Sequence, residues 1–190
     1  MGRIAGRPNI NTPEYWDSVY QAEILSDFWR VNYDRFAGVL KELNCPPETT
    51  FLDFAGGTGE LANIVQKQFG AKCFVYERSK VATKYGRLRH PRVAFLDDVP
   101  TEKFDVVHCG QTLEHCDDPA SLLGLLKGLT KHTLIVTVPY EDQVQDEEHV
   151  WEFNMDELFN MLLPHDKYVS VTRMVTDKRY LIGVLKHDNL

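Results

Sequence analysis

The 190-residue sequence predicts a doubly wound α/β fold, in which a mostly parallel sheet carries helices on both of its faces. The first observation is that short apolar strands alternate with amphipathic helices between residues 50 and 164. The second is that two strand-like stretches, residues 168–175 and 180–185, follow one another near the C-terminus. Because only residues 176–179 separate them, too few for a parallel crossover, they should form an antiparallel hairpin.

Two helices should precede the first strand and form a helical cap over residues 1–48. Thr12, Pro13 and Glu14 supply an N-cap, a first-turn proline and a first-turn acid for the first helix. Ser26 is expected to cap the second helix, which the run Asn44-Cys45-Pro46-Pro47 ends. Apolar side chains recur at helical spacing in the first helix, at Trp16, Val19, Tyr20 and Ile24.

The α/β core should occupy residues 49–190 and form a single domain together with the cap. Its parallel strands are expected at residues 50–55, 72–76, 93–96, 104–109 and 133–138. Its helices are expected at residues 60–69, from Ser79 to about Arg87, from Pro119 to Leu129, and from a capping box of Asn154 and Glu157 to Pro164.

The composition argues against several classes of protein. The formal net charge is -7 and no basic stripe is present, so a polymeric nucleic acid is not expected as a partner. Neither a signal peptide nor a stretch apolar and long enough to cross a bilayer is seen, so no membrane association is expected. The four cysteines form no CxxC pair, which indicates a reduced, cytoplasmic protein.

The most informative segment is residues 51–60, where an apolar strand ends in a glycine-rich turn that begins a helix. Glycines there let the backbone approach a ligand, and open α/β sheets bind ligands beside the carboxyl ends of their strands. Glu77 ends the next strand and can accept hydrogen bonds from both hydroxyl groups of a ribose. Because Gly57, Gly59 and Ala62 also satisfy the dinucleotide fingerprint, NAD and S-adenosylmethionine both fit this segment.

Three features favour S-adenosylmethionine. The Asp53 carboxylate would repel a pyrophosphate but attract the ammonium group of a methionyl moiety. The antiparallel hairpin departs from the all-parallel sheet of dinucleotide-binding domains. Finally, 190 residues leave no room for the second domain that most dehydrogenases carry.

With these motifs the chain resembles the class I S-adenosylmethionine-dependent methyltransferases of the broad type 11 branch. The matching motifs are LDFAGGTGELA at residues 52–62, FVYE at 74–77, FDVVHCGQTLEHCDDP at 104–119 and IVTVP at 135–139. The resemblance implies a Rossmann-like sheet of seven strands whose last strand is antiparallel. It also implies S-adenosyl-L-methionine as the cofactor and methyl transfer as the activity.

The resemblance further implies which residues hold the methionyl end of the cofactor. Asp53 should bind it together with the glycine-rich turn, and Cys109 and Gly110 should offer backbone groups. Ala55 replaces the first glycine of the usual pattern and should tighten the turn. The residues of the turn are Ala55, Gly56, Gly57 and Gly59.

At the nucleoside end, the resemblance places Glu77 on the ribose and Arg78 against the adenine. Either Asp97 or Asp98 should meet the adenine amino group, since both follow the third core strand. The connection between residues 96 and 104 is too short for the helix that usually lies there, which predicts a shallower adenine pocket.

The acceptor should bind where the fourth and fifth core strands end. Candidate contacts or general bases are Glu114, His115 and His149. Simpler interpretations are a helix cap for Glu114 and His115 and a solvated loop residue for His149. No HExxH or CxxC spacing is present, so no metal is expected. Expected aromatic walls of the acceptor site are Tyr15, Trp16, Trp29, Tyr140 and Trp151, although Trp16 and Trp29 could equally be core residues of amphipathic helices.

The sequence thus predicts a small-molecule O- or N-methyltransferase, monomeric or homodimeric, that transfers the methyl group in line. Two alternatives stay open at this point. One is an NAD-dependent oxidoreductase built on the same glycine-rich turn. The other is a catalytically silent domain that keeps the cofactor pocket as a scaffold or activating subunit.

Overall fold

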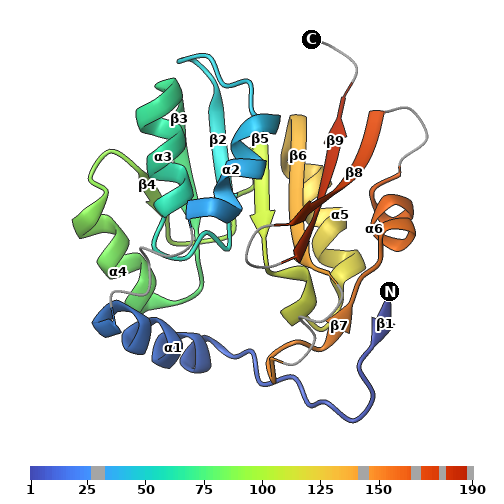
Figure 1. Cartoon of the computed structure of the whole chain (residues 1–190). Coiled ribbons are helices and arrows are strands. Elements are labelled where there is room, and N and C mark those ends of the chain that lie inside the picture. Colours follow the sequence, from blue (N-terminus) through green and yellow to red (C-terminus); the bar gives the residue numbers. More distant parts are fainter. Residues whose placement is uncertain (27–32, 141–145, 164–167, 176–178, 188–190) are drawn as a thin grey trace.

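A seven-stranded sheet forms the centre of the computed structural model, which describes residues 1–26, 33–140, 146–163, 168–175 and 179–187 (Figure 1). The strand order is β4-β3-β2-β5-β6-β9-β8, and β9 runs antiparallel to both of its neighbours. The strand order reverses between β2 and β5, which places a crevice beside their carboxyl ends. The strands are β2 (Thr50–Phe54), β3 (Lys72–Tyr76), β4 (Ala94–Leu96), β5 (Phe104–Gly110), β6 (Thr130–Pro139), β8 (Tyr168–Val175) and β9 (Arg179–Lys186).

Helices cover both faces of the sheet, as the alternation of strands and helices predicted. The helices α2 (Tyr33–Glu42) and α3 (Glu60–Phe69) pack on one face, and α5 (Pro119–Leu129) and α6 (Met155–Leu162) pack on the other. The helix α4 (Lys80–Arg89) flanks β4, and α1 (Pro13–Ser26) runs across the carboxyl ends of the strands (Figure 1).

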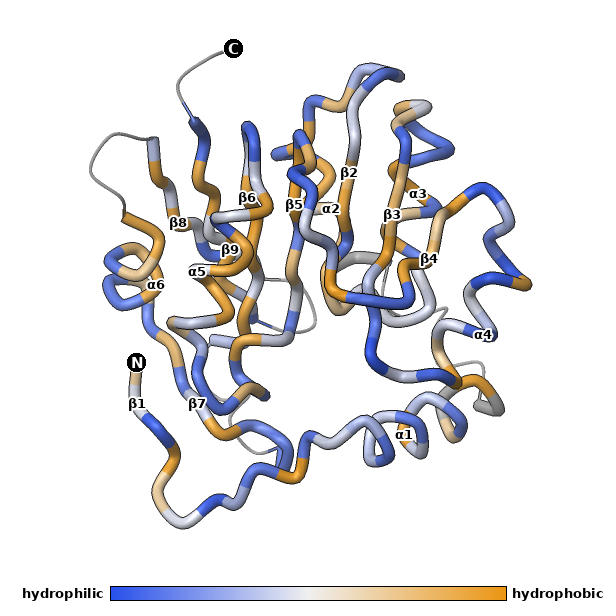
Figure 2. Tube along the Cα trace, turned by 180° about the vertical axis from the view of Figure 1, so that it is seen from behind, coloured by the Kyte–Doolittle hydropathy of each residue, from blue (hydrophilic) through white to orange (hydrophobic). Residues whose placement is uncertain are grey.

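Two apolar cores result, one under each layer of helices. Hydrophobic residues predominate along the strands of the sheet, and hydrophilic residues are frequent in the connecting loops (Figure 2). Successive residues of β2 alternate between the cores, so that Phe51 packs under α3 and Leu52 packs under α5. Both side chains are fully buried. By the same alternation Asp53 in β2 and His108 in β5 lie on the α3 side, and the two residues are paired in the parallel register of the strands.

Most predicted elements are confirmed, including the C-terminal hairpin and the absence of a described helix between β4 and β5. The predicted caps also form: Ser79 Oγ accepts a hydrogen bond from the Ala82 amide, and Asn154 and Glu157 form a capping box. The prediction for Ser26 was wrong, because this residue ends α1 and α2 begins at Tyr33. The start predicted for the second helix, residues 27–32, lies outside the described residues.

The N-terminal strap, which we define as residues 2–12, was not predicted as structure. Its strand β1 (Gly2–Arg3) pairs antiparallel with β7 (Trp151–Glu152). At the other end of the strap, the side-chain amide of Asn11 donates a hydrogen bond to the carbonyl of Glu148 at 2.8 Å. The strap thereby joins the loop after β6 to the start of α1.

In the described part of the chain, no helix is both long and apolar enough to cross a membrane.

Candidate functional site

The glycine-rich turn after β2 has a backbone that suits glycine and is closely packed. Gly57 and Gly59 have positive φ angles of 57° and 79°, where a side chain is strained. A Cβ atom on Gly56 would lie 2.7 Å from the Asp53 Cγ atom. Ala55 also has a positive φ, 57°, so the alanine that replaces glycine in the resembled pattern keeps a strained conformation. The turn therefore brings bare backbone next to the Asp53 carboxylate.

Glu77 links this turn to the end of β3. Its Oε2 atom accepts a hydrogen bond from the Gly57 amide at 3.0 Å, and its Oε1 atom accepts one from the Ser79 amide at 2.8 Å. Burial raises the pKa of Glu77, although the backbone donors favour its ionised form. The carboxylate is thus held in place beside the turn, in position to accept hydrogen bonds from ribose hydroxyls.

His108 is a site residue that the sequence analysis missed. Its Nδ1 atom lies 2.7 Å from Oδ1 of Asp53, and both side chains are almost fully buried. If Asp53 is ionised, Nδ1 carries the proton and Nε2 is left as an acceptor. Among the described residues, Nε2 has no hydrogen-bond partner, and His108 lines the cavity. The signal that could have found it is a polar residue in an apolar strand, next to the strand that carries Asp53.

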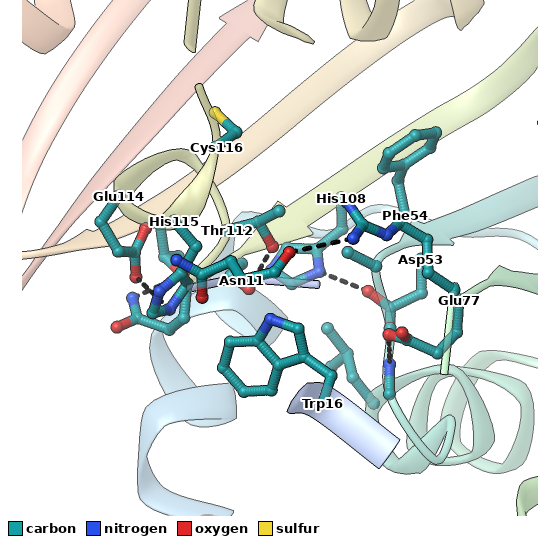
Figure 3. Close-up of a pocket in the computed structure, with 18 of the residues that line it drawn as sticks. Asn11, Trp16, Asp53, Phe54, Glu77, His108, Thr112, Glu114, His115 and Cys116 are labelled. Atoms are coloured by element: carbon teal, nitrogen blue, oxygen red, sulfur yellow. Dashed lines mark hydrogen bonds and ion pairs between the residues drawn. The ribbon is translucent and has the colours of Figure 1, made fainter. Parts of the chain in front are cut away.

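A cavity of about 600 Å³ extends from these residues to the turn after β5. Asp53, Glu77 and His108 lie on one side of it, and Glu114 and His115 lie on the other (Figure 3). Trp16 of α1 also lines the cavity, and its ring centroid is 5.1 Å from that of His115. The remaining predicted residues in the cavity lining are Ala55, Gly56, Gly57, Arg78, Gly110 and His149.

The second end of the cavity gathers Glu114, His115 and His149. One nitrogen or oxygen atom of each residue lies within 4.8 Å of those of the other two. His115 lies on the short 3₁₀ turn Leu113–His115, and its Nδ1 atom donates to the carbonyl of Glu148 at 3.1 Å. Burial lowers the pKa of His115 to about 4, so the ring is neutral at physiological pH.

The comparisons with known proteins decide the family. A profile of the family described as a methyltransferase domain matches residues 22–168, more than half of the chain. The chain belongs to this family. It is a methyltransferase whose cofactor is S-adenosylmethionine. A search of curated proteins gave no match.

Solved structures share the fold of this methyltransferase at low sequence identity. A chain of the complex between the Haloferax volcanii Trm112 methyltransferase activator and a methyltransferase has a TM-score of 0.72 at 15% identity, covering 92% of this chain and 96% of that one. Magnesium protoporphyrin IX methyltransferase of Synechocystis PCC 6803, solved with S-adenosylhomocysteine, has a TM-score of 0.69 at 14% identity, covering 94% of this chain and 96% of that one. The 1,6-didemethyltoxoflavin-N1-methyltransferase of Burkholderia thailandensis has a TM-score of 0.67 at 16% identity, covering 99% of this chain and 95% of that one.

Several residues predicted for the cofactor are not among the described residues that line the cavity of the methyltransferase. Asp97 forms an exposed ion pair with Arg87, with 2.6 Å between Oδ1 and Nη2, and Asp98 is also exposed. The Cys109 side chain is buried in the core. Gly59 instead forms the N-cap of α3. Arg78 does line the cavity, and it donates to the carbonyl of Asn11 at 3.0 Å.

Three of the predicted aromatic walls also lie outside the described lining of the cavity. Tyr15 packs edge-on against Trp16, with 5.5 Å between the ring centroids. Tyr140 accepts a hydrogen bond from Arg173 at 2.8 Å, and Trp151 donates to the carbonyl of Cys116 at 2.7 Å. Trp29 lies outside the described residues.

The cysteines of the methyltransferase supply no nucleophile to the site. All four are free thiols, and burial raises the pKa of each, to about 11 in Cys45 and to about 12 in Cys73 and Cys116. Because the thiolate is the reactive form, these groups are inert at neutral pH.

Proposed function

We propose that this methyltransferase methylates an oxygen or nitrogen atom of a small molecule by in-line displacement at the sulfonium methyl group. The single observation that carries the proposal is the continuous cavity from Asp53 and Glu77 to Glu114, His115 and His149. Its volume of about 600 Å³ is that of a small-molecule site. The net charge of -7 also disfavours a polymeric nucleic acid as the acceptor.

At the cofactor end, we assign the ribose to Glu77 and the adenine side to Arg78. The Asp53 carboxylate and the His108 Nε2 atom would receive the methionyl ammonium group, because both are acceptors at the same buried point. Gly110 lies against His108, since a Cβ atom on it would be 2.7 Å from the His108 Cε1 atom. The bare backbone there leaves room for the His108 ring.

At the acceptor end, we assign Glu114, His115 and His149 to contacts with the acceptor, with Trp16 as a wall. The protein would accelerate transfer mainly by aligning the acceptor atom with the methyl carbon and by excluding water. The cofactor itself supplies the activated methyl group.

The test is thermal unfolding with S-adenosylmethionine, S-adenosylhomocysteine and NAD, followed by transfer of a labelled methyl group to pools of small hydroxyl and amino compounds and to RNA and DNA. A hundredfold excess of ligand over its Kd should add about 2.7 kcal/mol of stability. We expect the two adenosyl compounds to stabilise the chain and the label to enter a small molecule. Label in nucleic acid, or binding without any transfer, would contradict the proposal.

A further inference from the structure

Glu114, His115 and His149 together have the composition of a metal centre. One donor atom of each residue lies within 4.8 Å of the other two, and the His115 Nε2 atom is 3.8 Å from the Glu114 Oε1 atom. Two imidazoles and one carboxylate are the ligands of known catalytic zinc ions, in which a fourth position stays open. We propose that these three residues bind a divalent transition-metal ion of the zinc class at the acceptor end of the cavity.

The orientation of His115 is that of a metal ligand. A carbonyl oxygen can only accept, so the contact between Nδ1 and the Glu148 carbonyl at 3.1 Å places the ring proton on Nδ1. The lone pair of Nε2 is then directed to the side where Glu114 lies. Metal-bound histidines are commonly oriented in this way, by a carbonyl or carboxylate that accepts from the second ring nitrogen.

The backbone holds the other two ligands close together although 35 positions separate them in sequence (149 less 114). The Val150 amide donates to the Glu114 carbonyl at 2.8 Å, which fixes the His149 loop against the 3₁₀ turn. Arg7 of the N-terminal strap donates to the carbonyls of Asp146 and His149, at 2.6 and 3.1 Å. The ligand set is therefore organised before any ion arrives.

Burial gives a further reason for a cation here. The side chains of Glu114, His115 and His149 are 1%, 11% and 9% exposed. Attraction between a cation and the Glu114 carboxylate is stronger in such a water-poor site than it would be at the surface.

The separations between donor atoms fit an ion after a small movement. Bonds of about 2.0–2.1 Å to a tetrahedral zinc ion place neighbouring donors roughly 3.3 Å apart. The His115 Nε2 and Glu114 Oε1 atoms are 3.8 Å apart, and all three donor atoms lie within 4.8 Å of one another. Ligation would therefore draw His115 and Glu114 together by about 0.5 Å and the other pairs by up to about 1.5 Å, which side-chain rotation can supply. Nitrogen donors also favour zinc, cobalt or iron over magnesium and calcium, which prefer oxygen ligands.

The role of this ion rests on the proposed methyl transfer. An acceptor hydroxyl bound at its open position would release a proton to solvent, since zinc lowers the pKa of bound water from about 16 to about 7. The acceptor oxygen would then form a bond to the methyl carbon. The carbon–sulfur bond would break with its electron pair returning to sulfur, which leaves neutral S-adenosylhomocysteine. The acceptor class is therefore a small molecule with an ionisable hydroxyl group.

The first test is titration of the metal-free full chain with Co²⁺, followed by visible absorption, with Zn²⁺ as competitor and Mg²⁺ as a negative control. We expect one Co²⁺ per chain, displaced by Zn²⁺ and not by Mg²⁺. Glu114→Gln and His149→Ala should weaken binding by more than the roughly 10–100-fold that loss of an outer-shell partner costs. The matched control is His132→Ala, because His132 also lies near a carboxylate, Asp105, but on β6 away from the cavity.

A second measurement does not depend on the folding of any variant. In ¹⁵N-labelled wild-type protein, Zn²⁺ should shift the ring nitrogen resonances of His115 and His149 and leave those of His132 unchanged. Unshifted resonances, or Co²⁺ binding that survives both ligand substitutions, would overturn the metal site. Stabilisation by S-adenosylhomocysteine is measured on the same samples without metal, so failure of the metal site and failure of the proposed function are seen separately.

Discussion

The two ends of the cavity are built in different ways. The cofactor end comes mainly from one continuous strand, turn and helix, and it is completed by Glu77 at the end of β3 and His108 in β5, the strands on either side. The acceptor end combines three segments that are distant in sequence: the 3₁₀ turn after β5, residues 146–150, and the N-terminal strap. The first end is built on the backbone of the central sheet. The second is held by the backbone hydrogen bond from Val150 to Glu114 and by side-chain contacts to loop carbonyls.

Because the two ends are built differently, substitutions at each end should have different effects. A change at the cofactor end alters the fixed backbone or the buried Asp53–His108 pair, so it should affect both folding and cofactor affinity. A change at the acceptor end should leave the sheet and the cofactor affinity nearly intact. Three tests probe this contrast, from the largest expected effect to the smallest.

The largest effect is expected from Asp53→Asn. The variant keeps a carbonyl oxygen for His108 but loses the charge that faces the methionyl ammonium group. A hydrogen bond to a charged group contributes about 1.5–3 kcal/mol, so S-adenosylhomocysteine should bind roughly 10–150-fold more weakly by calorimetry. Asp156→Asn, an exposed carboxylate at the start of α6, is the matched control. For contrast, His149→Ala should change this affinity by less than about twofold. An equal loss in His149→Ala and Asp53→Asn would remove the distinction between the two ends.

The next effect concerns the two residues of the turn that share a φ of 57°. Gly57→Ala should destabilise the fold by about 2 kcal/mol, because a left-handed conformation costs an alanine roughly 1–2 kcal/mol and the new Cβ atom would lie 2.6 Å from the Tyr20 hydroxyl. Ala55→Gly should instead stabilise by up to about 1 kcal/mol, since relief of strain exceeds the entropy cost of glycine. Urea unfolding measures both. Shifts of the same sign would show that the turn is not strained as described.

The smallest effect is a pH dependence at Glu60, the first residue of α3. Burial opposes its ionisation, but His90 and Arg89 more than offset this and lower the pKa of Glu60 below its ordinary value of 4.5. A lowered carboxyl pKa stabilises the fold above the ordinary value, and the contribution is lost as pH falls through the lowered value. Stability should therefore fall as pH drops below about 4.5 and through the lowered pKa of Glu60. Glu60→Gln should flatten that part of the curve in urea unfolding at each pH. If the stability of this variant fell with pH as steeply as that of the wild type, Glu60 would not be the group responsible.

The sequence was most informative where the structure is local. The conformation of the segment from Asp53 to Glu60 could be predicted from its own residues, because a strand, a glycine-rich turn and a helix follow one another without a gap. Glu77 could be predicted for the same reason, as the acid at the end of the next strand. The antiparallel β9 followed from the shortness of the connection before it.

Prediction failed where residues meet only through the tertiary fold. His108 is paired with Asp53 by the register of two parallel strands, and a single sequence does not state that register. Glu114, His115 and His149 were all expected at the acceptor site, but their spacing did not predict that their donor atoms would lie within 4.8 Å of one another. The adenine contact of Asp97 or Asp98 stays a prediction; in the structure Asp97 forms an ion pair with Arg87.

The N-terminal strap touches both ends of the cavity, at Asp146 and His149 through Arg7 and at Arg78 through Asn11. Any free energy needed to order this segment therefore reduces the affinity for the cofactor and the affinity for the acceptor alike. A ligand that orders the strap from one side lowers that cost for the ligand on the other side, and thermodynamic linkage makes the benefit reciprocal. Cooperativity between donor and acceptor is thus available to this small enzyme without any movement of the sheet.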